Sequence, residues 1–444
     1  MGKAGCLALC LALLFTVAAG ANWKEIELYI PKPHVYDLYH CSDAHAIYMV
    51  VPAPPDVSIH IVNLTDVSVR RVGIKGVIPG YVGGVQCATA GDKIYLFTAD
   101  SVVIYFLRYN AWVKIPYPNR AVTPLDLAVA SHQDLLYILR EVDGRRVIEI
   151  RDPRDFSLVD TIPADGVYAI KSFPDGVLAY GSNNVTVLGQ NKTFTTRWFM
   201  GAALLKGRLY IVGGADEIET DGIAVKKAPR DDAVALDADG NYLYLAVRRL
   251  HPQGSLEEVY VYDAELRHVS TLLPIGYYHF LTKPSPLVKV GNYTALILVG
   301  HPQWISRYHY GNYLWIKVFY TTDIASIKPS SLQICKLFTY IGFFELLVNY
   351  NNLMQYNGVG IKCIKLANLL PGRYYVDADN SAIVSLFWLP HAVREVVDLK
   401  PGEDRFILLY DKSTVYVGLA AALYVALLYW KLRRRVSDIS DLLR

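Results

Sequence analysis

Three features of the sequence predict an all-β fold. Short runs of β-branched, aliphatic and aromatic residues alternate with Gly, Asp, Asn and Pro, as at 47–50, 93–97, 135–139, 208–212 and 242–246. No segment between residues 22 and 328 keeps a helical period. Long apolar runs of signal or membrane length occur only near the two ends. The chain of 444 residues suits two or three domains.

The first 21 residues predict a secretory signal peptide. Lys3 gives the positive start, Leu7–Val17 the short apolar segment, and Ala19-Gly20-Ala21 the small residues of a cleavage site. Cleavage would place the mature start near Asn22. The alternative is an uncleaved signal anchor, and both alternatives export the segment that follows.

Four cysteines remain after a signal peptide is removed: Cys41, Cys87, Cys335 and Cys363. An even number outside the cell favours disulfides, and four cysteines allow three pairings. We expect Cys41 to pair with Cys87 and Cys335 with Cys363, because the members of each pair are close in sequence.

Residues 22–328 carry a repeat that predicts a ring of sheets. An aromatic or aliphatic strand core recurs near positions 48, 95, 137, 179, 210, 244 and 297, with a mean spacing of 41.5 residues. A four-stranded propeller blade has about this length, and blades bury their faces by stacking into a closed ring. The short steps of 31 and 34 leave both six and seven blades open. A pair of β-sandwiches is the alternative.

Local strings add a family resemblance. Lys206–Gly214, a strand that ends in a double glycine, resembles the kelch repeat, and 237–245 and 172–178 resemble the Asp-Gly hairpins of YVTN-type repeats. The resemblance covers about 300 residues and implies a β-propeller. It implies no catalytic residue.

Residues 329–411 differ in texture and predict a small membrane-proximal β-sandwich. An apolar segment at 334–348 is followed by expected strands at 359–366, 373–376, 382–389 and 406–410. The alternative is that this region supplies a closing strand for the ring.

The segment 412–432 predicts a single transmembrane helix. Thr414–Trp430 holds no charged residue, and 17 helical residues span about 25 Å. Lys431, Arg433, Arg434 and Arg435 follow at once and predict that the tail 433–444 is cytoplasmic and the larger part extracellular. The predicted location is therefore the cell surface, as a single-pass type I protein.

Four Asn-x-Thr sequons agree with export and predict a glycoprotein: Asn63, Asn184, Asn191 and Asn292. Charge excludes one class of partner, because 44 Lys and Arg nearly balance 41 Asp and Glu without a long basic block. Nucleic acid binding needs a concentrated basic face. The expected partners are a membrane and a surface protein or glycan.

Common catalytic motifs are absent from the sequence, which contains no His-Glu-x-x-His, P-loop, Gly-x-Ser-x-Gly or Cys-x-x-Cys. His40, Cys41 and His45 have metal-ligand spacing, yet a disulfide at Cys41 is the preferred interpretation. Asp237, Asp239 and Asn241 imitate a calcium loop, but Arg248 stands where the closing carboxylate belongs, which favours a hairpin turn.

Two further groups of residues are candidate sites. The acidic insert 216–221, with Asp231 and Asp232 downstream, suits a cation or acid–base work on a glycan, and solvated loops are the plainer interpretation. The segment 277–320 gathers aromatic and hydrogen-bonding side chains that suit recognition, with packing as the alternative. Its candidate binding residues are Tyr277, Tyr278, His279, Trp304, Arg307, Tyr308, Tyr310 and Trp315.

The leading function is a membrane-anchored surface module that binds or scaffolds without catalysis. The alternatives are an anchored extracellular enzyme of propeller type, glycoside-processing or redox, and an accessory subunit whose span packs on another membrane protein through Gly418, Ala421, Ala422 and Ala426. The sequence names no cofactor.

Overall fold

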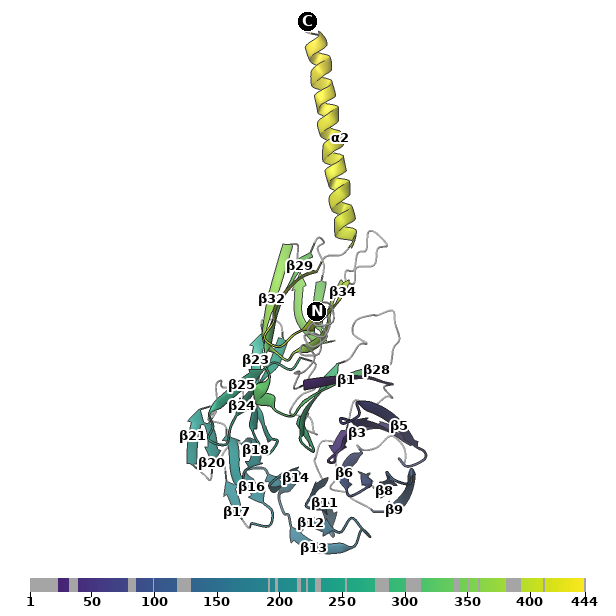
Figure 1. Cartoon of the computed structure of the whole chain (residues 1–444), viewed down its shortest axis with the longest axis vertical. Coiled ribbons are helices and arrows are strands. Elements are labelled where there is room, and N and C mark those ends of the chain that lie inside the picture. The colour runs from purple at the N-terminus through teal and green to yellow at the C-terminus, as the bar shows by residue number, and fades with distance from the viewer. Residues whose placement is uncertain are drawn as a thin grey trace, which may run out of the picture. The chain divides into compact units, whose positions relative to one another are not determined.

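The computed structural model describes residues 23–31, 39–78, 85–98, 100–117, 129–190, 192–195, 199–213, 217–220, 223–227, 233–251, 254–275, 287–300, 313–338, 343–349, 351–357, 360–380, 393–409 and 412–442. The chain divides into two compact units. Unit 1 holds Met1–Arg249 and Leu256–Lys328, and unit 2 holds Leu250–Ser255 and Pro329–Arg444. The strands and the C-terminal helix are drawn in Figure 1.

Unit 1 is built from four-stranded sheets, and the described residues form seven of them. In six sheets the strand order follows the chain. The first three contain β2 (Tyr39–Ser42), β3 (Ala46–Ala53), β4 (Asp56–Asn63) and β5 (Ser68–Ile74); β6 (Gln86–Ala90), β7 (Lys93–Phe97), β8 (Ser101–Phe106) and β9 (Ala111–Pro116); β10 (Val129–His132), β11 (Leu135–Val142), β12 (Arg145–Arg151) and β13 (Leu158–Pro163).

The next three sheets repeat this plan. They contain β14 (Val167–Phe173), β15 (Gly176–Gly181), β16 (Asn184–Val187) and β17 (Lys192–Thr195); β18 (Phe199–Leu205), β19 (Arg208–Gly213), β20 (Glu217–Thr220) and β21 (Ile223–Lys227); β22 (Ala233–Ala238), β23 (Leu243–His251), β24 (Gly254–Tyr262) and β25 (His268–Leu272).

The remaining sheet joins the two ends of unit 1. Its order is β1-β28-β27-β26, made from β1 (Trp23–Pro31), β28 (Tyr313–Thr321), β27 (Tyr293–Gly300) and β26 (Leu287–Val290). β1 pairs antiparallel with β28, from Trp23 opposite Thr321 to Pro31 opposite Tyr313. The N-terminal strand therefore closes the unit, and the closing strand expected as an alternative from residues beyond 329 is instead part of unit 2.

Burial explains why the repeat was visible in the sequence. Second strands are covered on both faces, as in β3, where Ala46–Val51 are all buried. Fourth strands such as β9 and β13 are mostly exposed. A strand covered on both faces reads as a continuous apolar run, whereas an outer strand alternates or is polar. The seven repeat marks of the sequence lie in β3, β7, β11, β15, β19, β23 and β27, one in each sheet.

Hairpin turns connect these strands. Lys206 and Gly207 have φ values of 51° and 73°, so two successive left-handed residues form the turn between β18 and β19. Such turns match the right-handed twist of the paired strands. The kelch-like string therefore lies on an ordinary two-residue hairpin.

Unit 2 contains two sheets. In one, β29 (Ser330–Phe338) pairs antiparallel with β32 (Gly360–Leu369) and parallel with β35 (Asp404–Leu409). The other has the order β31-β30-β33-β34, from β31 (Asn351–Asn357), β30 (Phe343–Val348), β33 (Gly372–Asn380) and β34 (Val393–Leu399). The strand expected at 382–389 lies outside the described residues. The 3-10 turn η2 (Ile324–Ser326) lies just before β29 in the sequence.

A long helix, α2 (Lys412–Leu442), follows the sheets of unit 2. Its side chains between 419 and 435 are exposed, including Leu423, Leu427 and Trp430. Among the helices of the described residues, none has the combined length and hydropathy of a membrane span. The helix extends through the four-cation cluster and ten residues beyond the predicted segment 412–432.

Candidate functional site

A central cavity is the main candidate site in unit 1. Its volume is about 660 Å³, and its walls come from one edge strand of each of six sheets, namely β2, β6, β10, β14, β22 and β26. We call this the first strand of its sheet; in the closing sheet it is β26, which β27 and β28 follow in the chain. Residues from hairpin turns line the same hollow, including Ala44, Gln133, Pro174 and Gly291. First strands that face one shared cavity are the arrangement expected of a ring of sheets around an axis.

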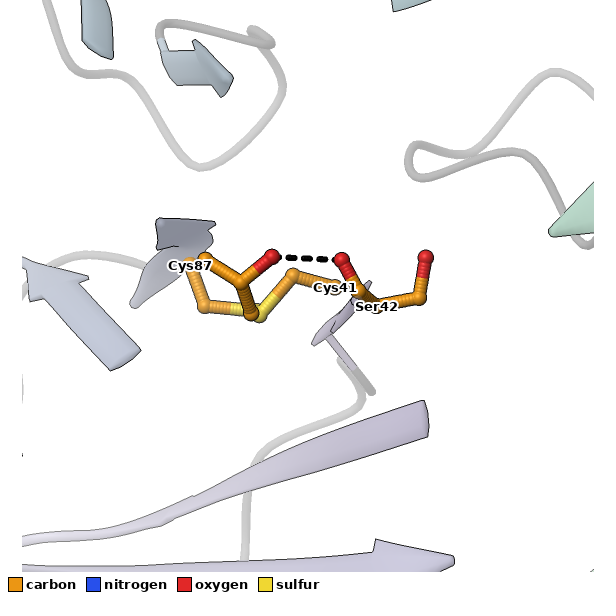
Figure 2. Close-up of a disulfide and its surroundings, with 4 residues drawn as sticks. Cys41, Ser42 and Cys87 are labelled. Carbon is orange, nitrogen blue, oxygen red and sulfur yellow. Dashed lines mark hydrogen bonds between the residues drawn. A yellow bond between two sulfur atoms is a disulfide. The ribbon is translucent and has the colours of Figure 1, made fainter. Parts of the chain in front are cut away.

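A disulfide forms part of the cavity wall. Cys41 on β2 and Cys87 on β6 are joined, with a Cα–Cα distance of 5.6 Å, and so connect first strands of two adjacent sheets. Figure 2 shows this bridge beside Ser42. The Thr89 hydroxyl donates to the Ser42 carbonyl oxygen at 2.5 Å, and the Ser42 hydroxyl donates to the Lys289 carbonyl oxygen at 3.0 Å. These contacts fix three neighbouring first strands. The second predicted disulfide, Cys335–Cys363, joins directly opposite residues of β29 and β32.

An ion pair crosses part of the cavity wall. Lys171 Nζ on β14 lies 2.7 Å from Asp237 Oδ2 on β22, and the Asp237 side chain is 4% exposed. These two strands belong to sheets separated by the β18–β21 sheet. A Cβ at Gly201 on β18 would come within 2.7 Å of the Leu236 backbone nitrogen, so β18 packs close to β22 because Gly201 has no side chain.

A hydrogen-bond network surrounds Asp239, next to the cavity. Asp239 Oδ1 accepts the backbone N–H groups of Asn241 and Tyr242 at 2.8 and 2.9 Å. Its Oδ2 accepts the hydroxyls of Tyr244 at 2.7 Å and Thr294 at 2.5 Å. Four donors therefore surround one buried carboxylate, and burial together with Asp239 raises the pKa of Tyr244 well above its usual value.

The His132 imidazole also lines the central cavity, which adjoins a second hollow. Burial lowers the pKa of His132, although the Phe173 backbone and Asp175 act in the opposite direction, so this imidazole is neutral at pH 7. A second hollow of about 350 Å³ is lined by Ser42–His45, Thr89–Gly91 and 131–134, which are strand ends and the turns that follow them. It shares Asp43 and His132 with the central cavity and lies at the hairpin end.

The predicted aromatic binding residues are mostly outside the described part of the chain: Tyr277, Tyr278, His279, Trp304, Arg307, Tyr308 and Tyr310. The exception, Trp315, is fully buried on β28, with Lys317 Nζ 5.7 Å from its ring centre. Trp315 therefore packs in the closing sheet and presents no surface to a ligand.

The two metal-like groups of the sequence take part in structural contacts. Cys41 is in a disulfide, and His45 is exposed in a turn where its backbone N–H donates to Asp43 Oδ1. Asp239 forms the β22–β23 turn described above. In the residues that the structure describes, no three His, Cys, Asp or Glu side chains cluster as a metal site.

The described part of the acidic insert, residues 217–220, is a strand. Glu217 and Glu219 belong to β20, the third strand of its sheet, which pairs with β19 and β21. Neither carboxylate lines the central cavity. Asp216, Asp221, Asp231 and Asp232 lie outside the described residues. The expectation of a solvated loop at the insert is therefore wrong for residues 217–220.

The sequons lie in different surroundings. Asn184 and Asn292 are exposed. Asn63 is half-buried, and its Oδ1 accepts the backbone N–H groups of Thr65 and Asp66. Asn191 lies outside the described residues. Glycosylation of all four stays a prediction.

The sequence did not single out the polar residues that line the central cavity most directly. Lys171, Ser131 and Lys289 each lie on a first strand, two or three residues before a hairpin turn. The same position recurs in each repeat, so it could identify cavity-lining residues. It can be recognised only when the strand order within each sheet is known.

Comparison with known proteins gives fold neighbours only. No protein-family model matches the chain, and neither does any curated protein. Similar solved structures include the WD40 domain of Neurospora crassa Pan2, at 10% identity and TM-score 0.41, over 67% of this chain and 95% of that one. A chain of the mitotic checkpoint complex is similar at 11% identity and TM-score 0.43, over 66% of this chain and 93% of that one. At these identities and TM-scores the likeness carries no functional information.

Proposed function

We propose that this chain is an interaction module held at a membrane, with unit 1 as the recognition part. In this proposal each four-stranded sheet is one blade of a seven-bladed propeller of the kelch or YVTN kind. The partner is a protein or a glycan outside the cell. The observation that carries the proposal is the gathering of turns from separate sheets around one cavity mouth.

The hairpin end has the chemistry of a recognition surface. Ala44, Asp92, Asp134 and Asp175 are exposed in turns between first and second strands. Strands that lead into these turns are held by the Cys41–Cys87 disulfide and, at β22, by the Asp239 network. Variable polar loops on a rigid scaffold are the usual form of a binding surface.

Catalysis is less well supported than binding, because three carboxylates in or next to the central cavity, Asp43, Asp237 and Asp239, are engaged in structural contacts. Asp237 pairs with Lys171, Asp239 accepts four donors, and Asp43 accepts two backbone N–H groups and the Tyr48 hydroxyl. A general acid or base needs a carboxylate free to exchange a proton with substrate.

Helix α2 is the proposed anchor. Its support is the uncharged run Thr414–Trp430, the exposure of Leu423 and Leu427, and the four cations that follow. Cations on the cytoplasmic side of a span orient it, so this placement puts unit 1 outside the cell. Two disulfides and the exposed sequon residues Asn184 and Asn292 agree with that side.

A photo-crosslinking experiment tests the recognition surface. A crosslinking residue at Ala44, on the hairpin end, is compared with one at Lys192, exposed on the fourth strand β17. We expect Ala44 to capture one reproducible partner, whose capture falls when Asp92 and Asp134 are both changed to Asn. Equal capture from Lys192, or capture that ignores the Asn variants, would contradict the proposal.

Alkaline extraction of membranes tests the anchor. The full chain should stay with the lipid pellet, whereas a chain ending at Leu409 should be released. Release of the full chain would remove the anchor from the proposal and leave the recognition surface standing.

A further inference from the structure

One face of the three-stranded sheet of unit 2 carries large apolar side chains that are exposed. Ile361 on β32 is 63% exposed, and Phe406 and Leu408 on β35 are 58% and 49% exposed. Alternate residues of a strand point to the same face of its sheet. Leu408 is paired with Cys335 on β29, and Cys335 lies opposite Cys363, two residues from Ile361. The three exposed side chains therefore share one face.

The other face of this sheet belongs to the core of unit 2. It presents Leu332, Ile334, Leu366 and Leu409, which are all buried. The core therefore accounts for one face, and the exposed apolar residues lie on the other. Single exposed apolar side chains are ordinary, whereas a group of them on one face marks contact with a partner molecule or a membrane.

Polarity changes along the exposed face. β35 runs parallel to β29 and β32 runs antiparallel to it, so the end of β35 and the start of β32 lie at the same end of the sheet. From that end to the other, the face presents Ile361, then Cys363 and Leu408, then Lys365, Gln333 and Phe406, and then Asp404. A surface that is apolar at one end and polar at the other suits the boundary between a bilayer and water.

The apolar end is also the end from which the chain continues to α2. β35 ends at Leu409 and α2 begins at Lys412. Leu408 is therefore at most about 14 Å along the chain from the start of α2. The uncharged run begins at Thr414, so in the proposed anchor the start of α2 lies in the headgroup layer. The apolar end of the sheet is then within reach of the same layer.

We propose that the apolar end of this sheet, formed by Ile361, Phe406 and Leu408, contacts the outer surface of the membrane that α2 spans. The inference depends on the proposed anchor and adds a second site of lipid contact to it. The three side chains enter the layer of headgroups and upper acyl chains, to a depth of about 5–10 Å. A second copy of this chain is a poorer occupant, because a stable dimer interface takes about 20–30 residues on each side. Two contacts with one bilayer hold unit 2 against it.

Photo-crosslinking in lipid vesicles tests the contact. The full chain is reconstituted into phosphatidylcholine vesicles with a crosslinking residue at Ile361 or, as the matched control, at Lys365. Both positions are exposed on the same face of β32, and about 13 Å separates them. We expect position 361 to capture phospholipid in about threefold or greater excess over position 365, which lies beyond the depth of insertion. Equal capture at the two positions, or capture of a second copy of the chain in place of lipid, overturns the proposal.

A third position separates this inference from the anchor itself. Leu423 is exposed on α2, and a crosslinking residue there reports contact of the helix with lipid. Lipid capture at 423 but not at 361 overturns the sheet contact and leaves the anchor standing. Capture at 361 but not at 423 supports the sheet contact and removes the span. Capture at neither position overturns both.

Two variants test the apolar side chains. Leu408→Asp should lower lipid capture from position 361 by about threefold or more, because a carboxylate loses hydration when it enters the interface. Gln333→Asp places the same charge at the polar part of the same face and should leave the capture unchanged. Unchanged capture in Leu408→Asp overturns the proposal. Thermal unfolding checks that this variant is folded, and if it is not, Phe406→Asp takes its place with the same expectation.

Discussion

Lys317 should hold the closing sheet of unit 1 together. Its Nζ lies 3.0 Å from Glu25 Oε2 and 3.4 Å from Glu27 Oε1, and its side chain is 3% exposed. Both acids are on β1 and the lysine is on β28, so the contact joins strands about 290 residues apart in sequence. Changing Lys317→Met removes the cation and leaves two carboxylates, 23% and 19% exposed, without it.

Breaking a buried ion pair from one side costs about 3–5 kcal/mol of unfolding free energy. Because the two acids keep some contact with water, we expect a loss near the lower bound, about 3 kcal/mol. Replacing all three groups, with Glu25→Gln and Glu27→Gln added, should recover part of the loss, since a half-buried amide has a smaller desolvation penalty than an unpaired carboxylate. Urea unfolding of the full chain in micelles, followed by tryptophan fluorescence, measures both.

Lys24→Met is the matched control, because Lys24 is exposed on β1, the strand that carries Glu25 and Glu27. It should change the unfolding free energy by less than about 0.5 kcal/mol. A loss below about 1 kcal/mol in Lys317→Met, or a triple variant as unstable as the single one, would refute this account of the closure.

Three further variants test other parts of unit 1. Gly201→Ala should destabilise by about 1–3 kcal/mol in urea unfolding, because its Cβ meets the Leu236 backbone, whereas Gly73→Ala, with open space around it, should change little. Burial raises the pKa of Glu149, but hydrogen bonds from neighbouring Tyr and Arg side chains outweigh it and lower the pKa below 4.5. Its stabilisation is therefore present above pH 4.5 and lost as pH falls, and Glu149→Gln should flatten that loss in a pH series. Burial and then Arg71 lower the pKa of His60 to about 4, so unfolding free energy should fall by about 2 kcal/mol from pH 7.5 to pH 5, and His60→Gln should abolish this fall.

The repeat was predictable because second strands are covered on both faces. Runs such as 47–50 and 93–97 are continuous and apolar for that reason. The number of sheets was harder to predict. The spacings of 31 residues from 179 to 210 and 34 residues from 210 to 244 are short, so two neighbouring strand cores could have belonged to one sheet. The structure gives the cause: β16, β17 and β20 have four residues each, and β21 has five. Short outer strands shorten the repeat without removing a sheet.

The cavity residues were not predictable from local pattern. Lys171 meets Asp237, 66 positions away, across an intervening sheet, and Lys289 meets Thr294 across a hairpin. Nothing in the sequence near Lys171 distinguishes it from a solvated lysine at a strand end. The disulfide pairs were predictable, because closeness in sequence limited the choices. Cys41–Cys87 joins strands of two neighbouring sheets, and Cys335–Cys363 joins two paired strands of one sheet.

Buried Lys317 and half-buried Lys171 have a common arrangement that bears on how the ring closes. Lys317 joins β28 to β1, and Lys171 joins β14 to β22. In each case the acids come from a strand that is not adjacent in sequence, so a misplaced strand would leave a lysine without its carboxylate. A buried ion pair adds little net stability over an apolar replacement, whereas an unpaired one is costly. The two lysines therefore penalise incomplete or shifted closure more than they stabilise the finished ring. The triple variant at Lys317, Glu25 and Glu27 should accordingly regain stability yet show faster hydrogen exchange at β1 than the native chain, because the open form is no longer penalised.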